Sequence, residues 1–326
     1  KEPVPAEYHL LREGQVLFMF FSLSAAEERT LALMKSGAIA IAYERVRLAD
    51  GSMPLLKPMS EIAGRAVAQL AAVYLGKTYQ GSGRLLGGVT GVPPASVVVL
   101  GAGTVGTGAA RVAAGIGAQV VVIDKDADRL RCLAEEIPGQ LETLVSDPDN
   151  IARAVREADV VIGAAAVAGQ RAPVLVTRQM LKTMKPGSVV IDAAIDQGGC
   201  IEASRPTTHE EPVYITGNII RYCVPNVPGM YPRTATVALA NATLPYALKL
   251  ANLGYHRALR EDGALRQGLS VFRGKLTDEQ VAASLGLEYT PGVDLLSGES
   301  LAGEPGEQRR ADEGYPGYEV EDQGNA

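Results

Sequence analysis

Short apolar runs alternate with amphipathic stretches along most of this 326-residue chain. The apolar runs are typical of buried strands and lie at residues 15–21, 38–43, 96–100, 119–123, 159–162 and 188–192. Stretches with apolar positions at helical spacing predict helices at residues 24–36, 59–75, 107–114 and 234–253. Strands that alternate with helices predict an α/β fold built on a doubly wound parallel sheet.

The same pattern predicts where regular structure begins and where it fails. The sequence Ser24-x-x-Glu27 predicts a capping box at the start of the first helix. Residues 212–226 show neither the helical nor the strand spacing of apolar side chains, and they are expected to be irregular. Beyond residue 296 the chain consists largely of Gly, Glu, Pro and Gln, with few large apolar side chains. Residues 297–326 are therefore expected to be disordered.

A glycine-rich turn follows the apolar run at residues 96–100. Gly101, Gly103 and Gly106 form a G-x-G-x-x-G sequence that leads into a helix, which is typical of a Rossmann-type dinucleotide site. The next strand ends on Asp124, about 20 residues further on, where a carboxylate accepts hydrogen bonds from ribose hydroxyls. A carboxylate there also repels a 2′-phosphate, which favours NAD(H) over NADP(H). The alternative is a βαβ unit with an incidental glycine turn.

Composition limits the classes of protein this chain can be. Its length suits two domains, and its net charge of −6 leaves no basic footprint for nucleic acid. Cys132, Cys200 and Cys223 have no metal-ligand spacing and no even count for disulfides, which fits a reducing, cytoplasmic setting. No apolar run is long enough to span a membrane. The chain opens on Lys1 in mid-pattern, so a longer parent protein is expected.

Several further motifs carry a resemblance to a known family. In order along the chain, they occupy residues 1–3, 54–65, 101–106, 195–199, 204–208 and 241–246. Together they resemble NAD-dependent alanine dehydrogenase and, more distantly, the NAD(H)-binding part of proton-pumping transhydrogenase. The resemblance implies a Rossmann-type NAD-binding domain at residues 55–232, inserted in a second α/β substrate domain. That domain would comprise residues 1–54, with its upstream portion absent, and residues 233–296.

The resemblance also implies roles for individual residues. Lys1 would bind the substrate carboxylate or carbonyl, and Asp196 matches the catalytic carboxylate. The implied NAD-binding residues are Ser60, Gly101, Gly103, Thr104, Val105, Gly106, Asp124, Arg129, Ser146, Ala165, Ala166, Ile195, Arg205, Val224, Asn226 and Val227. Asp196 could instead cap its loop, and Arg205 could be a surface ion-pair residue. No cluster of His, Cys and Asp indicates a metal site.

One catalytic position departs from the family pattern. Family members place a histidine after the strand at residues 15–21, as acid and base for the substrate carbonyl, and this chain has Ser22 there. A hydroxyl donates a hydrogen bond but holds no proton in reserve. The three histidines, His9, His209 and His256, are expected to be solvated or structural. The substitution suggests a changed substrate, such as a preformed imine, or weak activity.

The resemblance implies a function and an assembly. The activity would be interconversion of L-alanine with pyruvate and ammonia, or of a related amino acid and imine, by hydride transfer. The alternative is a non-catalytic NAD(H)-binding paralogue that acts as a sensor or subunit. The expected partners are an amino-acid or 2-oxo-acid substrate and copies of the chain in a homohexamer built partly on residues 234–253, without nucleic acid or membrane.

Overall fold

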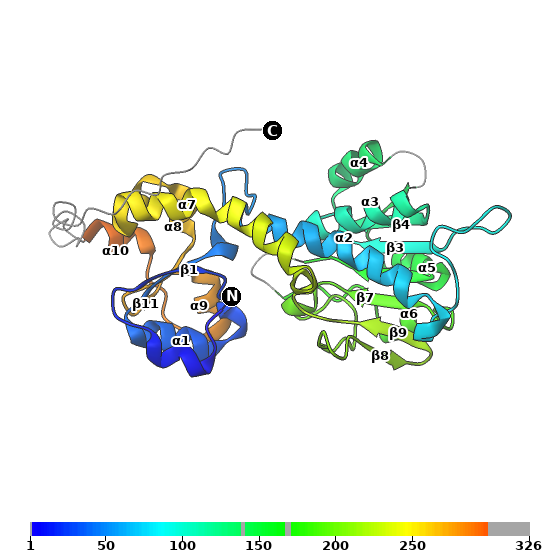
Figure 1. Ribbon diagram of the computed structural model, residues 1–326, viewed down its shortest axis with the longest axis horizontal. Coiled ribbons are helices and arrows are strands. Elements are labelled where there is room, and N and C mark those ends of the chain that lie inside the picture. Colours follow the sequence, from blue (N-terminus) through cyan, green and yellow to red (C-terminus); the bar gives the residue numbers. More distant parts are fainter. Residues whose placement is uncertain (1, 138–140, 167–170, 299–326) are drawn as a thin grey trace, which may run out of the picture.

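The structure is a computed structural model that describes residues 2–137, 141–166 and 171–298. Figure 1 shows two lobes, with the long helix α7 (Pro232–Glu261) running from one to the other. A seven-stranded sheet lies in one lobe and a four-stranded sheet in the other.

The larger sheet has the strand order β5-β4-β3-β6-β7-β9-β8. All neighbouring strands are parallel except the last pair, β8 and β9. The bounds in chain order are β3 Ser96–Leu100, β4 Gln119–Asp124, β5 Leu141–Val145, β6 Val160–Gly163, β7 Val189–Asp192, β8 Val213–Thr216 and β9 Ile219–Tyr222. The chain proceeds from β3 first to one side and then to the other. This doubly wound order confirms the Rossmann-type α/β fold.

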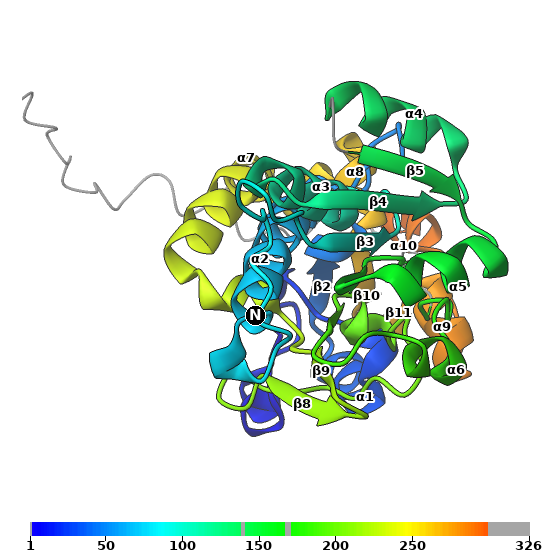
Figure 2. The same cartoon turned by 90° about the vertical axis from the view of Figure 1, so that its right-hand side faces the viewer.

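Helices cover both faces of this sheet, as Figure 2 shows from a second side. Val97 and Val99 of β3 face one hydrophobic cluster, and the alternate residues Val98 and Leu100 face the other. This period of two matches a strand buried on both faces. The first cluster includes residues of α2 Lys57–Tyr74, α3 Thr104–Ile116 and α4 Ala127–Glu136, and the second includes residues of α5 Pro148–Glu157 and α6 Arg178–Lys182.

The smaller sheet joins distant parts of the chain. Its order is β1-β2-β10-β11, with bounds Val16–Met19, Ile39–Ala42, Leu269–Phe272 and Lys275–Leu276. Strands β1 and β2 are parallel, with α1 (Glu27–Ser36) between them in the chain, whereas β10 runs antiparallel to β2. The remaining helices of this lobe are α8 Gly263–Gln267, α9 Glu279–Leu285 and α10 Gly292–Gly298.

Short 3-10 turns occur where several of these elements meet. Their bounds are η1 Pro5–Leu10, η2 Leu23–Ala25, η3 Tyr43–Arg45, η4 Lys77–Tyr79, η5 Ile195–Gln197 and η6 Val227–Met230. Helix α7 is longer than the helix expected at residues 234–253, and it is interrupted at Gly254, where φ is 72° and ψ is 158°. The interruption lies within the smaller sheet's lobe, because Tyr246 and Leu250 of α7 already pack against that lobe's core.

The expectation that residues 212–226 are irregular is wrong. Strands β8 and β9 form an antiparallel hairpin, joined by Gly217 and Asn218 with φ angles of 59° and 67°. Two successive positive φ angles define a type I′ turn, whose twist matches that of the strands. The edge strand β8 is half-exposed, and Arg221 interrupts the apolar run of β9, so the alternation was hidden in the sequence.

Two boundaries also differ from expectation. The capping box is wrong, because α1 begins at Glu27 after Ala26, and Ser24 lies in η2. The hydroxyl of Thr30 donates instead to the carbonyls of Leu23 and Ala26, which fixes the entry to α1. Helix α10 extends to Gly298, so residues 297 and 298 are helical and not disordered as expected. Residues 299–326 lie outside the described part of the chain.

Candidate functional site

The glycine turn between β3 and α3 is shaped by close backbone approaches. A Cβ at Gly101, where φ is 105°, would lie 2.8 Å from the carbonyl oxygen of Ala164. A Cβ at Gly106 would lie 1.8 Å from the carbonyl oxygen of Gly101. At Gly103 no described atom would lie within 4 Å, so space remains open above this peptide. The turn therefore leaves room for a phosphate at the N-terminus of α3.

Helix α2 packs tightly against α3 beside this turn. A Cβ at Gly64 would lie 2.3 Å from the carbonyl oxygen of Val105, and one at Gly108 would lie 3.3 Å from Gly64 Cα. The two helices can approach this closely only because both positions are glycine. The contact brings the first turn of α2, which contains Ser60, to the side of the glycine turn.

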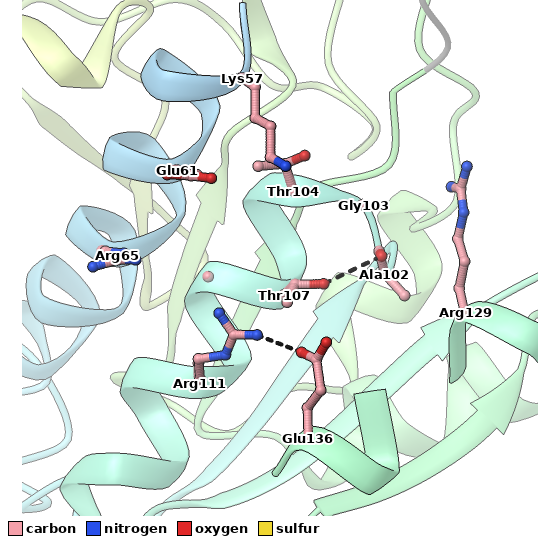
Figure 3. Close-up of a pocket in the computed structure, with 11 residues that line it drawn as sticks. Lys57, Glu61, Arg65, Ala102, Gly103, Thr104, Thr107, Arg111, Arg129 and Glu136 are labelled. Atoms are coloured by element: carbon pink, nitrogen blue, oxygen red, sulfur yellow. Dashed lines mark hydrogen bonds and ion pairs between the residues drawn. The ribbon is translucent and has the colours of Figure 1, made fainter. Parts of the chain in front are cut away.

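A cavity of about 400 Å³ opens between these helices and the glycine turn. Figure 3 shows side chains from α2, α3 and α4 around it. The lining residues are Lys57, Glu61, Arg65, Ala102, Gly103, Thr104, Thr107, Gly108, Arg111, Arg129 and Glu136. Four of them are basic and two are acidic, and Arg111 is paired with Glu136. The remaining positive charge suits an anionic ligand such as a pyrophosphate.

Asp124 joins the end of β4 to the glycine turn. Its side chain is nearly buried, with 9% of the residue exposed. Oδ2 accepts a hydrogen bond from the Ala102 amide at 2.5 Å, and Oδ1 accepts one from the Asp126 amide at 2.9 Å. Arg129, in the first turn of α4, lines the cavity and lies 3.4 Å from the Asp126 carboxylate. Arg129 therefore faces the cavity, whereas Asp124 is not among the residues that line it.

Other residues expected at the cofactor follow the carboxyl ends of the strands. Ser146 follows β5 and donates its amide to the Asp124 carbonyl at 2.9 Å. Ala165 and Ala166 follow β6, while Ile195 and Asp196 lie in η5 after β7. Parallel strands end at a common edge of the sheet, and the structure brings these residues together there. Such an edge is where ligands bind in doubly wound folds.

A buried carboxylate supports the loop that carries Asp196. Asp192, at the end of β7, accepts hydrogen bonds from the amides of Ala194, Cys200 and Ile201 at 3.1–3.3 Å. Asp196 itself is exposed at the surface of η5. Sequence reasoning missed Asp192, although an acidic residue that ends an apolar run was a signal. Burial and the nearby Asp192 raise the pKa of the Cys200 thiol, so this cysteine stays neutral.

The remaining expected cofactor residues lie beyond β7. The Arg205 guanidinium sits over the Tyr214 ring, 4.3 Å from its centroid, and its amide donates to the Tyr214 hydroxyl. Val224 and Val227 are buried, so their side chains belong to the core and only their backbone could meet a ligand. Asn226 has a φ of 56° and directly precedes η6.

The second group of expected residues lies in the smaller lobe. Ser22 is exposed after the end of β1, with a φ of 52°. Its amide donates to Oε1 of Glu44 at 2.7 Å, and the Phe21 amide donates to the same oxygen at 3.0 Å. Sequence reasoning missed Glu44, whose signal was an acidic residue directly after the apolar run at 38–43. Lys1 lies outside the described residues.

The described residues contain no group of His, Cys, Asp and Glu that could hold a metal ion. Among the described helices, none is long and apolar enough to cross a membrane. His9 and His209 are exposed, whereas His256 is buried with Nε2 3.1 Å from the Leu296 carbonyl oxygen, a structural contact.

The fold and the site define a two-lobed α/β protein with a Rossmann-type dinucleotide cleft. Two family profiles assign the chain to a particular family within this class. The profile described as "Alanine dehydrogenase/PNT, C-terminal domain" matches residues 67–279, and the one described as "Alanine dehydrogenase/PNT, N-terminal domain" matches residues 1–63. The chain belongs to the alanine dehydrogenase/PNT family, and the family implies a nicotinamide-dinucleotide cofactor.

Curated relatives and solved structures agree with this assignment. The chain is 51% identical to an alanine dehydrogenase of Mycolicibacterium smegmatis, over 91% of this chain and 80% of the relative. It is 50% identical to one of Bacillus subtilis, over 92% and 79%. A solved L-alanine dehydrogenase matches with a TM-score of 0.83 and 48% identity, over 87% of this chain and 79% of that one. The resemblance expected from the sequence is confirmed, and the dehydrogenase interpretation is favoured over the non-catalytic one.

Proposed function

We propose that the protein is an NAD-dependent alanine dehydrogenase that interconverts L-alanine with pyruvate and ammonia. The observation that carries the proposal is the convergence of the glycine turn, Asp124 and the Asp196 loop at one edge of the sheet. Identity of about half the residues to named alanine dehydrogenases supports the choice of substrate.

The residues present fit a dinucleotide. The open peptide at Gly103, the N-terminus of α3 and the basic cavity would hold the pyrophosphate. Asp124 would accept hydrogen bonds from the ribose, which favours NAD(H) over NADP(H). When bound, the nicotinamide supplies or accepts the hydride. Further contacts are proposed for Ser60, Thr104, Val105, Arg129, Ser146, Ala165, Ala166, Ile195, Arg205, Val224, Asn226 and Val227.

The substrate would be held and protonated by residues from both lobes. We assign to Lys1 the binding of the substrate carboxylate or carbonyl. Asp196, at the carboxyl end of β7, would polarise the reacting centre and relay a proton there. Ser22, at the carboxyl end of β1, would donate a hydrogen bond to the substrate oxygen. The protein's main contribution is orientation of the substrate Cα against the nicotinamide.

The proposal extends to domains, assembly and location. Pairing of β2 with β10 supports one substrate domain made of residues 1–54 and 233–296 around a cofactor domain of residues 55–232. Helix α7 exposes Val237, Leu244 and Leu248, which supports a homo-oligomer, taken here as a hexamer. Three free cysteines support a cytoplasmic location.

The direct test is NADH oxidation by the purified protein with pyruvate and ammonium together. We expect turnover only when both are present, because ammonia must add to the carbonyl before the Cα accepts a hydride. Pyruvate without ammonium, and ammonium without pyruvate, are the matched controls. NADH binding without turnover on pyruvate or any other 2-oxo acid would support the non-catalytic alternative instead.

A further inference from the structure

Ser22 and Glu44 meet at one edge of the smaller sheet. Strands β1 and β2 are parallel neighbours, so their carboxyl ends lie side by side. Ser22 follows β1, and Glu44 lies in η3 directly after β2. Oε1 of Glu44 accepts the amides of Phe21 and Ser22 and thereby holds Ser22 in its left-handed conformation. The carboxyl group is thus fixed beside the position where the family has its histidine.

The second oxygen of Glu44 has a different environment. Oε2 is buried and has no hydrogen-bond partner among the described residues. A buried carboxylate oxygen without a partner is costly when charged, and protonation removes that cost. Burial accordingly raises the pKa of Glu44, and the bonds from the Ser22 and Phe21 amides and the charge of Arg45 oppose this only in part.

The charged groups around Glu44 form their described bonds with residues other than Glu44. Arg45 of the same turn is paired with Asp278 at the start of α9 and donates to Gln280 Oε1. Arg29 of α1 donates to the carbonyls of Pro3 and Phe21 at 3.1 Å and 2.6 Å. Burial raises the pKa of Tyr43, which keeps its hydroxyl neutral. Among the described interactions, neither arginine forms a hydrogen bond or an ion pair with the Glu44 carboxylate.

We propose that Glu44 holds the proton that the reaction needs at the Ser22 end of the substrate site, in place of the missing histidine. The structure bonds Glu44 to the Ser22 amide and not to the Ser22 hydroxyl. The Ser22 side chain would turn toward the carboxyl group to pass the proton on, and Glu44 is therefore a positioning and proton-holding residue. This inference rests on the proposed alanine dehydrogenase function. It also explains how the protein could work with a serine, which alone keeps no proton in reserve.

The proton transfer balances in the reductive direction. Ammonia adds to the pyruvate carbonyl to give a carbinolamine, whose C–O bond then breaks while the nitrogen lone pair forms the C=N bond. The Ser22 hydroxyl gives its proton to the departing oxygen and takes the Glu44 proton, so the products are iminium, water and the Glu44 carboxylate. In the oxidative direction water adds to the iminium and the proton returns to Glu44.

The first test compares kcat/KM against pH for the wild type, Glu44→Gln and the exposed control Glu157→Gln. The glutamine side chain keeps an oxygen acceptor for the two backbone amides but has no acidic proton to give. We expect Glu44→Gln to lower kcat by about 100-fold, in the range of lost general acid–base help, and to abolish an ionisation above the usual glutamate range. NADH affinity should be unchanged, and Glu157→Gln should behave as wild type. Adding Ser22→His to Glu44→Gln should restore turnover with an ionisation near neutrality.

The second test does not depend on activity. Because the folded pKa of Glu44 is raised, the native state binds more protons than the unfolded state between the two pKa values, and its stability falls as pH rises through that window. The Tm of the wild type minus that of Glu44→Gln should therefore decrease with rising pH. If Glu44→Gln does not fold, the wild-type kcat/KM profile decides, since it must contain the raised ionisation.

The outcomes separate this inference from the proposed function. A pH-dependent Tm difference in a protein without alanine activity would support proton holding by Glu44 and overturn only the reaction. A flat Tm difference would overturn the inference, as would full activity with an unchanged profile in Glu44→Gln. Loss of the raised ionisation from the kcat/KM profile of Glu44→Gln, together with unchanged NADH affinity, would support both the role of Glu44 and the proposed function.

Discussion

At the scale of single residues, Asp124 has two tasks. It holds the Ala102 amide of the glycine turn, and it would bind the ribose. We predict that the wild type binds NAD(H) about tenfold or more tightly than NADP(H), since a carboxylate repels a 2′-phosphate. Asp124→Gly should narrow that ratio in a fluorescence titration. The neighbouring exposed substitution Asp128→Ser should leave it unchanged, and equal affinities in the wild type would contradict the assignment.

Asp196 is the residue whose loss should affect the chemical step most. We expect Asp196→Asn to lower kcat by about 100-fold or more while NADH affinity stays the same, because the carboxylate acts on the transition state rather than on binding. Steady-state kinetics and NADH titration measure the two effects separately. The exposed Asp149→Asn, in α5 of the same lobe, is the control. A matching loss of NADH affinity would instead indicate a structural role.

At the scale of elements, the contact between α2 and α3 can be tested with two glycines. Gly64→Ala places a Cβ 2.3 Å from the Val105 carbonyl oxygen, so the helices must separate. Gly115→Ala, inside α3, meets no described atom within 4 Å and removes only unfolded-state freedom. We predict that Gly64→Ala lowers the free energy of unfolding by about 1–3 kcal/mol and weakens NADH binding. Gly115→Ala should raise the free energy of unfolding by about 0.4–1 kcal/mol, as measured by urea denaturation. Equal changes in the free energy of unfolding for the two variants would contradict the close contact between α2 and α3 at Gly64.

The elements also show what a sequence can and cannot predict. The glycine turn was recognisable because Gly101, Gly103 and Gly106 satisfy local backbone requirements, and the strands of the large sheet because they are buried on both faces. Glu44 and Asp192 were missed because their value depends on amides that folding brings to them, in the case of Glu44 from 22 and 23 residues away. The β8–β9 hairpin was missed because an edge strand is half-exposed and its apolar alternation is weak.

At the scale of the whole molecule, the two lobes are built from interleaved parts of the chain. Strand β2 pairs with β10 across more than two hundred residues of sequence, and α7 connects the two lobes. The order of the motifs along the chain predicted how the two domains divide into segments. The register of the β2–β10 pairing, with Ala40 opposite Val271, depends on long-range packing, which no local sequence pattern contains. The assigned domain boundaries remain a prediction, which limited proteolysis can test.

Helix α7 is the surface on which we expect copies of the chain to associate. Leu248 is 52% exposed, and Val237 and Leu244 of the same helix are 58% and 56% exposed. We predict that Leu248→Arg lowers the assembled mass, measured by analytical ultracentrifugation, towards the 34.2 kDa of one chain. The equally exposed Val174→Arg, in the other lobe's surface loop, should not change it. An unchanged mass for Leu248→Arg would place the interface elsewhere.

In the proposed reaction, this protein moves a hydride between nicotinamide and the Cα of alanine. The most direct measurement uses NADH with deuterium at both C4 positions, pyruvate and ammonium, and follows the product by mass spectrometry and NMR. We expect alanine with deuterium at Cα, formed only when enzyme and ammonium are both present. Formation of deuterated lactate, or no transfer of deuterium from the cofactor to any product, would contradict it.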